Sequence, residues 1–226
     1  MYVSIVIPTI NEAQNIPVIF ERIKNTLKGY KYEIVVVDDN SSDDTVGIAT
    51  SLGAKVIKHD FRRGVGYSVM EGAVNSRGDI VVIMDADGSH DPAILPNLVR
   101  MVEDKYDVAK ASRFIHGGHM EERVISTVLF NIIAKMLLNI KVNDITGGYL
   151  AAKKECFNIH PFFNDGRWIL WFMFSNRTRK IIEVPYIYRK RVTGYSKYGG
   201  IKHLKRGFNY FSCLIHLLML RLIASR

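Results

Sequence analysis

The segment DIVVIMD at residues 79–85, followed by PAILPNLVRMVED at residues 92–104, predicts the fold of this chain. The first part is a short run of β-branched and other apolar residues, which is typical of a strand buried on both faces. The second part has apolar residues at helical spacing after a proline, which indicates an amphipathic helix. Together they predict one strand followed by one helix.

Three similar units precede this one. In each, a strand-like run is followed by a helical pattern: residues 3–8 and then 15–27, residues 32–39 and then 43–52, and residues 54–60 and then 67–76. Four such units predict an α/β fold, with a Rossmann-like, mostly parallel sheet flanked by helices. Ligands of such sheets bind beyond the carboxyl ends of the strands, where this sequence places polar and acidic loops.

The second half of the chain has a different pattern. It contains short strand-like runs and a long amphipathic stretch at residues 124–142, and we expect it to cover the edge of the sheet and help shape the ligand site there. The apolar run at residues 208–224 is short for a bilayer span and is interrupted by His216 and Arg221. We therefore predict one large domain at residues 1–200 and a tail at residues 201–226, whose amphipathic, hydrophobic helix associates with a membrane surface or binds an anchoring partner.

The net charge and the cysteine content indicate which kinds of partner and which compartment suit this chain. The 226 residues carry a formal net charge of +9, which favours an anionic partner. Predicted cations and carboxylates are interleaved at the ligand edge and no nucleic-acid module is recognised, so we predict no nucleic acid partner. The two cysteines have no CxxC spacing, which argues against a disulfide framework and favours a reducing, cytosol-facing location.

Two aspartates, Asp85 and Asp87, end the strand quoted first. Carboxylates so close together repel each other unless a cation or hydrogen-bond donors compensate them. They can converge on a hard divalent cation, Mg²⁺ or Mn²⁺, and on the phosphates that it carries. The alternative is a capped turn before the helix that begins near Pro92.

A second acidic cluster lies at residues 38–44, after another predicted strand. Asp39 is placed to accept hydrogen bonds from a nucleobase or a ribose, while Asp43 and Asp44 are interpreted as helix-start residues. Arg62 and Arg63 precede a glycine-containing turn, which is suited to anions. Histidines in loops are more often surface groups than ligands, so we expect His90, His116 and His119 to be on the surface.

Seven ordered motifs between residues 6 and 200 resemble those of the family 2 glycosyltransferases of the A-type (GT-A) fold, and within them the dolichyl-phosphate mannose synthase group. The motifs are VIPTINEAQNI (6–16), EIVVVDDNSSDDT (33–45), RRGVGYSVMEG (62–72), RGDIVVIMDADGSHDP (77–92), SRFIHGG (112–118), DITGGYLAAKKE (144–155) and EVPYIYRKRVTGYSKYGG (183–200). The resemblance implies an inverting, metal-dependent enzyme that moves mannose from GDP-mannose, a nucleotide-diphosphate sugar donor, to a polyisoprenyl phosphate acceptor. It further implies a peripheral position on the cytoplasmic face of a membrane.

The same resemblance implies roles for individual residues. The nucleotide pocket would be lined by Pro8, Ile10, Glu12, Val37 and Asp39. Asp85 and Asp87 would bind the metal and the diphosphate, with Ala86 beside them, and Ser89 stands where the family carries a glutamine that helps hold the metal. The phosphates would be contacted by Arg113, Arg191 and Lys197, and the acceptor phosphate would be faced by Arg123 and Ser126.

Two alternatives concern the substrates. A phosphate acceptor is ionised near neutral pH and needs no general base, whereas a glycan hydroxyl has a high pKa and needs one. For a glycan acceptor, Asp165 is the candidate base. The donor alternative is UDP-glucose or another nucleotide sugar, and the residues do not separate these donors.

Overall fold

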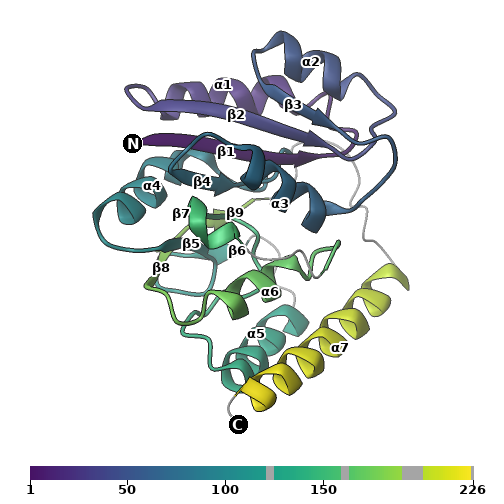
Figure 1. The fold of residues 1–226 in the computed structure, drawn as a ribbon, viewed down its shortest axis with the longest axis vertical. Helices are drawn as coiled ribbons and strands as arrows, with labels where there is room; N and C mark the ends of the chain where they lie inside the picture. Colours follow the sequence, from purple (N-terminus) through teal and green to yellow (C-terminus); the bar gives the residue numbers. More distant parts are fainter. Residues whose placement is uncertain (121–124, 159–162, 190–200, 225–226) are drawn as a thin grey trace.

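The computed structural model of the chain describes residues 1–120, 125–158, 163–189 and 201–224. Its centre is a seven-stranded sheet with the strand order β3-β2-β1-β4-β7-β5-β8 (Figure 1). The strands are β1 (Tyr2–Thr9), β2 (Lys31–Asp38), β3 (Lys55–Lys58), β4 (Ile80–Ile83), β5 (Val108–Ser112), β7 (Leu150–Lys153) and β8 (Ile181–Pro185). Within this sheet, β7 runs antiparallel to β4 and β5, and the other pairs are parallel. The prediction of an α/β fold with a mostly parallel sheet is confirmed.

Helices cover both faces of this sheet. One hydrophobic cluster contains the buried side chains of α1 (Ile16–Thr26), α2 (Thr45–Ser51) and α4 (Leu95–Asp104). The other contains those of α3 (Val65–Asn75), α5 (Ile125–Leu138), α6 (Trp168–Ser175) and α7 (Ile201–Ala224). Short 3₁₀ helices lie at Pro92–Ile94 (η1) and Lys154–Phe157 (η2), and β6 (His119–Met120) pairs with β9 (Ile187–Tyr188) in a separate small sheet.

The alternation of side chains along β2 shows why apolar runs form this sheet. Val35 and Val37 belong to the cluster beneath α3, whereas Val36 belongs to the cluster beneath α1 and α4. Successive residues of a strand point to opposite faces, so a strand covered by helices on both sides must be apolar throughout. The same argument explains the fully buried IVVI sequence of β4.

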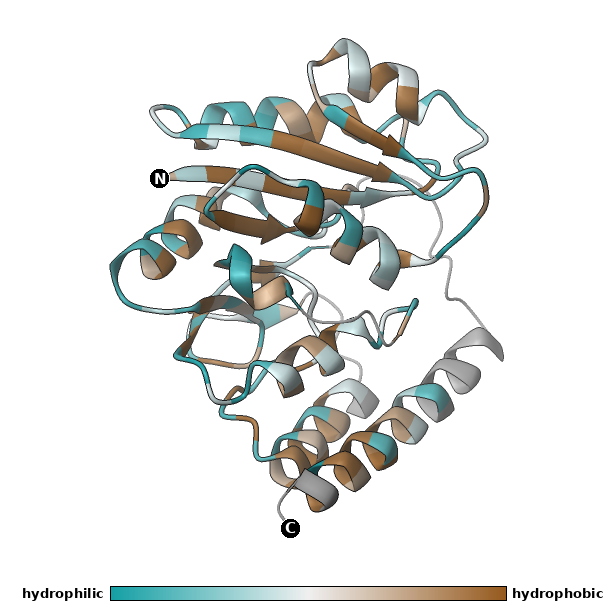
Figure 2. Ribbon diagram, in the orientation of Figure 1, coloured by the Kyte–Doolittle hydropathy of each residue, from teal (hydrophilic) through white to brown (hydrophobic). Residues whose placement is uncertain are grey.

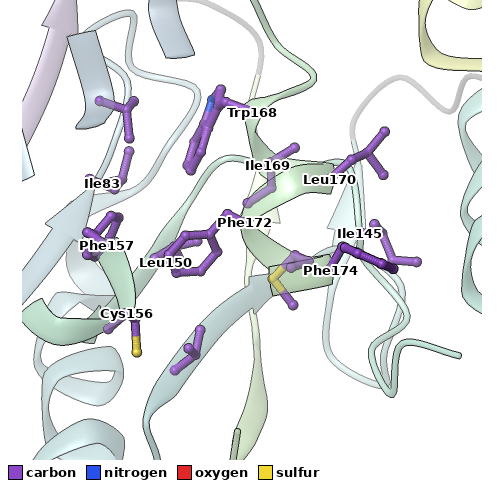
Figure 3. Close-up of a cluster of buried hydrophobic side chains, with 14 of the residues drawn as sticks. Ile83, Ile145, Leu150, Cys156, Phe157, Trp168, Ile169, Leu170, Phe172 and Phe174 are labelled. Carbon is purple, nitrogen blue, oxygen red and sulfur yellow. The ribbon is translucent and has the colours of Figure 1, made fainter. Parts of the chain in front are cut away.

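The core beneath α6 fixes one wall of the site. Ile83, Leu150, Phe157, Trp168 and Phe172 lie around one another (Figure 3). The Phe157 and Phe172 ring centroids are 4.9 Å apart, and the Trp168 ring meets Phe172 edge-on at 6.2 Å. Burial of each such aromatic side chain contributes about 2–3 kcal/mol, so α6 is held firmly against the sheet.

Helices α5 and α7 lie side by side at one end of the molecule (Figure 1). The Phe130 and Tyr210 rings meet edge-on at 5.5 Å, and Arg221 Nη1 donates a hydrogen bond to the Leu137 carbonyl at 2.6 Å. Apolar residues are interspersed with polar ones along both helices (Figure 2). Across the described ranges, no helix combines the length and the apolar composition needed to cross a bilayer.

Candidate active site

A cavity of about 440 Å³ opens at the carboxyl ends of the parallel strands. The loops after β1, β2, β4 and β5 all reach it, because parallel strands end at the same edge of a sheet. Antiparallel β7 begins at this edge, so Gly147 and Gly148 also line the cavity. Eight of the residues predicted for the site line it: Pro8, Ile10, Glu12, Asp39, Asp85, Ala86, Asp87 and Arg113.

Asp85 and Asp87 present carboxylates to the cavity from the turn after β4. The Asp87 side chain accepts a hydrogen bond from the Ser89 backbone N–H at 3.0 Å, and the Asp85 side chain is 47% exposed. Within the described ranges, no group of three or more His, Cys, Asp and Glu side chains could hold a metal ion. Two carboxylates fit a hard cation such as Mg²⁺ or Mn²⁺, which takes its remaining ligands from water and substrate phosphates.

His90 holds this turn and was missed as a site residue. It is buried, its Nδ1 accepts the Asp85 backbone N–H at 2.9 Å, and its Nε2 lies 3.8 Å from Asp85 Oδ2. Its ring stacks on Tyr149 with the centroids 4.7 Å apart. Burial lowers the pKa of His90, which favours the neutral ring. The expectation of a surface position is wrong for His90, whereas His116 and His119 are exposed.

Two predicted residues do not line the cavity. The Val37 side chain is fully buried and packs close to Gly72 of α3, because the alternation of β2 points it into the core. The Ser89 residue is also fully buried. Its backbone shapes the turn instead, since the Ser89 N–H donates a hydrogen bond to Asp87 and the Ser89 carbonyl accepts one from the Arg189 N–H at 3.3 Å.

Asp39 ties the end of β2 to the loop that follows β3. Its Oδ1 accepts from His59 Nδ1 at 2.9 Å and from the Arg63 N–H at 2.6 Å, and its Oδ2 accepts from the Gly64 N–H at 3.0 Å. Burial alone would raise the pKa of Asp39, but these hydrogen bonds hold it below its usual value. The carboxylate therefore stays ionised and positions the Arg62–Gly64 loop, of which Arg62 and Gly64 line the cavity.

Gly64 permits this loop to close. Its φ of 92° lies in the left-handed region, and a Cβ at this position would come within 2.1 Å of the Asn164 carbonyl oxygen. Asn164 also accepts the Gly66 N–H at 2.9 Å. The loop is thus packed tightly against the segment before α6, and a side chain at Gly64 would force the two apart.

Arg113 lies in a buried cluster of charges at the end of β5. Its Nε and Nη2 each donate to one oxygen of Asp144 at 2.7 Å, and Nη2 also donates to Thr146 Oγ1 at 3.1 Å. Burial opposes the charge of Arg113, but Asp144 keeps the pKa of Arg113 above its usual value. Burial would likewise raise the pKa of Asp144, yet Arg113 and Lys110 hold it at about 2.

Lys110 completes this cluster from below the cavity. Its side chain is fully buried, and its ammonium donates to the carbonyl of Gly147, a cavity-lining residue. Burial lowers the pKa of Lys110 to about 8, although Asp144 opposes that change. Both Lys110 and Asp144 were missed from the sequence as site residues, and a lysine inside an apolar strand was the available signal for Lys110.

A second cavity, of about 500 Å³, lies between the loop after β5 and helix α5. Arg113 lines both cavities. The walls of the second cavity include the apolar side chains of Phe114, Met120, Val128, Ile132 and Met136. Its polar side chains include Asn131, Lys135 and Asn143, so the apolar lining also contains two cations, Lys135 and Arg113.

Several predicted residues cannot be compared with this geometry. Arg123, Arg191 and Lys197 lie outside the described residues. Ser126 lies in α5, and its side chain is outside the described part. The candidate base Asp165 does line the main cavity, where Arg167 Nε donates to its Oδ1 at 2.8 Å.

Residues 4–159 match the family described as Glycosyl transferase family 2. A dolichol-phosphate mannosyltransferase of Pyrococcus furiosus is 36% identical over 211 residues, which cover 88% of this chain and 60% of that protein. A polyprenol monophosphomannose synthase of Mycolicibacterium smegmatis is 29% identical over 224 residues, which cover 87% of this chain and 80% of that protein.

Solved structures show the same fold. A glucosyl-3-phosphoglycerate synthase from Mycobacterium tuberculosis, in complex with Mn²⁺, UDP and glucosyl-3-phosphoglycerate, has a TM-score of 0.76 and 22% identity. The match covers 96% of this chain and 80% of that chain. At this identity the likeness shows a shared architecture alone.

Proposed function

This chain belongs to glycosyl transferase family 2, and we propose that it transfers a sugar from a nucleotide-diphosphate donor to a polyisoprenyl phosphate. The donor we propose is GDP-mannose, and the product is a lipid-linked phosphomannose. The names of the Pyrococcus furiosus and Mycolicibacterium smegmatis relatives support this choice. The matched part of this chain spans 60% of the length of the first of these relatives.

One observation carries the choice of acceptor: Arg113 lines both the mixed polar and apolar cavity at the strand ends and the largely apolar cavity beside α5. A phosphate ester with a long apolar chain matches both environments, since its phosphate pairs with the guanidinium and its first isoprene units fill the apolar space. A hydrophilic acceptor would leave the apolar lining without a partner.

The donor diphosphate is assigned to the turn after β4. Asp85 and Asp87 would hold Mg²⁺ or Mn²⁺ together with the diphosphate, and the structures of glucosyl-3-phosphoglycerate synthase with Mn²⁺ or Mg²⁺ and UDP support a divalent cation. When bound, such a cation offsets the negative charge that develops on the leaving diphosphate. Asp39 and the Arg62–Gly64 loop shape the nucleoside end of the cavity.

The reaction needs alignment rather than proton abstraction. A phosphate monoester is largely ionised near neutral pH, so its oxygen attacks the anomeric carbon directly and the carbon–diphosphate bond breaks. Arg113 keeps its charge because of Asp144 and orients the attacking phosphate. A single displacement of this kind inverts the anomeric configuration. In this scheme Asp87, Arg113, Arg191 and Lys197 are the residues assigned to the reacting phosphates.

The α5 and α7 helices support a membrane location for the acceptor. Large apolar side chains are exposed on both: Leu129, Ile132, Met136 and Leu137 on α5, and Phe211, Ile215, Met219 and Leu222 on α7. Such side chains on amphipathic helices bind the headgroup region without crossing the bilayer. We assign residues 201–226 to this association, on the cytoplasmic face, either directly or through an anchoring partner.

A transferase that acts on a glycan hydroxyl is the second candidate, because Asp165 lines the main cavity. Both oxygens of its carboxylate already accept from Arg167 Nε, at 2.8 and 3.0 Å, so a substrate hydroxyl would have to displace this contact. Replacement Asp165→Asn distinguishes the two candidates. The phosphate-acceptor scheme expects turnover to persist, and loss of turnover with donor binding intact would support the hydroxyl acceptor.

The test of the proposed function is a transfer assay with purified protein, Mg²⁺ or Mn²⁺, a polyprenyl phosphate and a panel of radiolabelled GDP- and UDP-sugars. We expect label from GDP-mannose in the organic phase and none with Asp87→Ala. Label from UDP-glucose instead would change the donor. Metal-dependent donor hydrolysis without transfer would overturn the lipid acceptor.

A further inference from the structure

His59, at the end of β3, is buried between two carboxylates. Its side chain is 3% exposed, its Nδ1 lies 2.9 Å from Asp39 Oδ1, and its Nε2 lies 2.6 Å from Glu71 Oε2. Asp39 follows β2, and Glu71 lies in α3. The ring therefore joins three elements behind the wall of the main cavity, in which Asp39 takes part.

The hydrogen-bond inventory of an imidazole decides what this arrangement requires. A neutral ring carries one N–H and one lone pair, whereas an ionised carboxylate only accepts hydrogen bonds. A neutral His59 would therefore direct a lone pair at one of the two carboxylates. A doubly protonated ring donates to both carboxylates, so both contacts of the ring nitrogens are satisfied hydrogen bonds.

Two further side chains lie near the ring. Tyr67 of α3 meets the ring edge-on, with the centroids 5.7 Å apart. The Arg63 guanidinium stacks over Tyr67, 3.3 Å from its centroid. Among the described residues, the direct polar contacts given for the ring nitrogens are those with Asp39 and Glu71.

We propose that His59 is a positioning residue of the nucleotide site, held doubly protonated between Glu71 and Asp39 so that Asp39 keeps its orientation. This inference rests on the proposed function, because it takes the ligand of the cavity to be a nucleoside diphosphate sugar. His59 does not line the cavity and acts through Asp39. The scheme for sugar transfer given above assigns no role to His59.

The consequence for ligand binding follows from the remaining capacity of Asp39. A carboxylate has about four acceptor positions. His59, the Arg63 N–H and the Gly64 N–H take three of them, with two on Oδ1 and one on Oδ2. The fourth remains for a ligand donor, such as a base N–H or a ribose hydroxyl, because Asp39 lines the cavity. Without His59 the carboxylate loses a charged donor and is held by the Arg63 and Gly64 N–H groups alone, which weakens the control of both that position and the Arg62–Gly64 loop.

Three substitutions separate the two contacts of the ring. His59→Asn retains an N–H near the Nδ1 position and so keeps the bond to Asp39, whereas His59→Gln places its amide nearer the Nε2 position and Glu71. His59→Phe removes both. We expect the dissociation constants of GDP and GDP-mannose to rise roughly tenfold in His59→Phe and His59→Gln, and less in His59→Asn. The kcat at saturating donor is expected to change little, since the reacting atoms are not contacted.

The matched control is His116→Asn, which replaces an exposed histidine and leaves nucleotide binding unchanged. Thermal unfolding of each variant separates misfolding from weaker binding. Should His59→Phe fail to fold, Glu71→Gln gives the second test. This substitution keeps an oxygen acceptor for His59 Nε2 but removes the negative charge of Glu71. We expect it to raise the dissociation constant of the donor, and an unchanged dissociation constant would contradict the proposal.

A measurement that needs no ligand completes the test. In ¹⁵N NMR spectra of the full chain near pH 7, assigned with His59→Asn, the His59 signals are expected to show a proton on both ring nitrogens. A neutral ring overturns the inference, as does unchanged nucleotide affinity in both His59→Phe and His59→Gln. If wild-type protein binds neither GDP nor UDP, the proposed function fails and takes the nucleotide role of His59 with it, while a doubly protonated ring would still establish the arrangement itself.

Discussion

The proposed donor side and the proposed acceptor side of the site are built in different ways. On the donor side, at the ends of β1 to β4, polar groups are held by closely spaced hydrogen bonds, such as the three that Asp39 accepts. On the acceptor side, a buried charge cluster around Arg113 adjoins an apolar cavity and helix α5, whose Met136 is 75% exposed. The difference indicates a preformed site for a small polar ligand beside a surface that suits an apolar one.

If this comparison is right, substitutions on one side should leave binding on the other side unchanged. The largest effect is expected for Asp87→Ala, which removes a carboxylate from the donor side. Transfer should fall by about a thousandfold, because stabilisation of the leaving diphosphate is lost. Binding of polyprenyl phosphate, measured with fluorescent lipid, should not change. Asp104→Ala, an exposed aspartate at the end of α4, serves as the control, and equal losses in both variants would contradict the assignment.

On the acceptor side, Asp144→Asn should destabilise the protein by about 4 kcal/mol near pH 7, since it leaves the buried Arg113 guanidinium without its anion. The folded pKa of Asp144 is about 2, below its usual 3.8. Its stabilising contribution is therefore present above pH 3.8 and is lost as the pH falls through about 2. Urea unfolding of both proteins should show a difference that shrinks over that interval, and a difference independent of pH would show that Asp144 is not ionised.

The buried ammonium of Lys110 distinguishes the acceptor side further, because burial opposes its charge. The pKa of Lys110 in the folded protein is about 8, below its usual 10.5. The neutral amine that folding favours therefore contributes fully to stability above pH 10.5, and this contribution is lost as the pH falls through about 8. As the pH rises over this interval, the free energy of unfolding of the wild-type protein should increase by no more than about 3 kcal/mol relative to that of Lys110→Met. Urea unfolding at a series of pH values measures this difference, and the same pH dependence in both proteins would contradict the assignment.

A smaller effect is expected at the surface of α5. Met136→Glu places a charge in the lining of the apolar cavity and should raise the KM for polyprenyl phosphate roughly fivefold, which corresponds to about 1 kcal/mol. The dissociation constant of the donor should stay the same. Val18→Glu changes an exposed apolar residue of α1, on the other side of the molecule, and is the matched control. A change in donor binding with Met136→Glu would break the separation of the two sides.

The sequence predicted the donor side better than the acceptor side. Asp39, Asp85 and Asp87 follow apolar runs that end at the same edge of a parallel sheet, so their meeting could be inferred from order alone. Val37 was placed wrongly in the pocket wall, although the alternation along β2 points it into the core.

The residues that were missed depend on partners far away in the sequence. Arg113 and Asp144 are 31 residues apart, and Lys110 and Gly147 are 37 apart. These pairs meet only because β7 enters antiparallel between β4 and β5, and no local pattern specifies that placement. His90 was missed for a related reason, since its burial depends on Tyr149 and Tyr186, which approach from other elements.

The most direct test of the account is the dependence of transfer on the acceptor chain. Phosphate monoesters with an increasing number of isoprene units would be compared with 3-phosphoglycerate, a hydrophilic phosphate, at saturating GDP-mannose. We expect KM to fall with each of the first isoprene units, as apolar surface enters the cavity beside α5, while the dissociation constant of the donor stays constant. Equal or better transfer to the hydrophilic phosphate would contradict it.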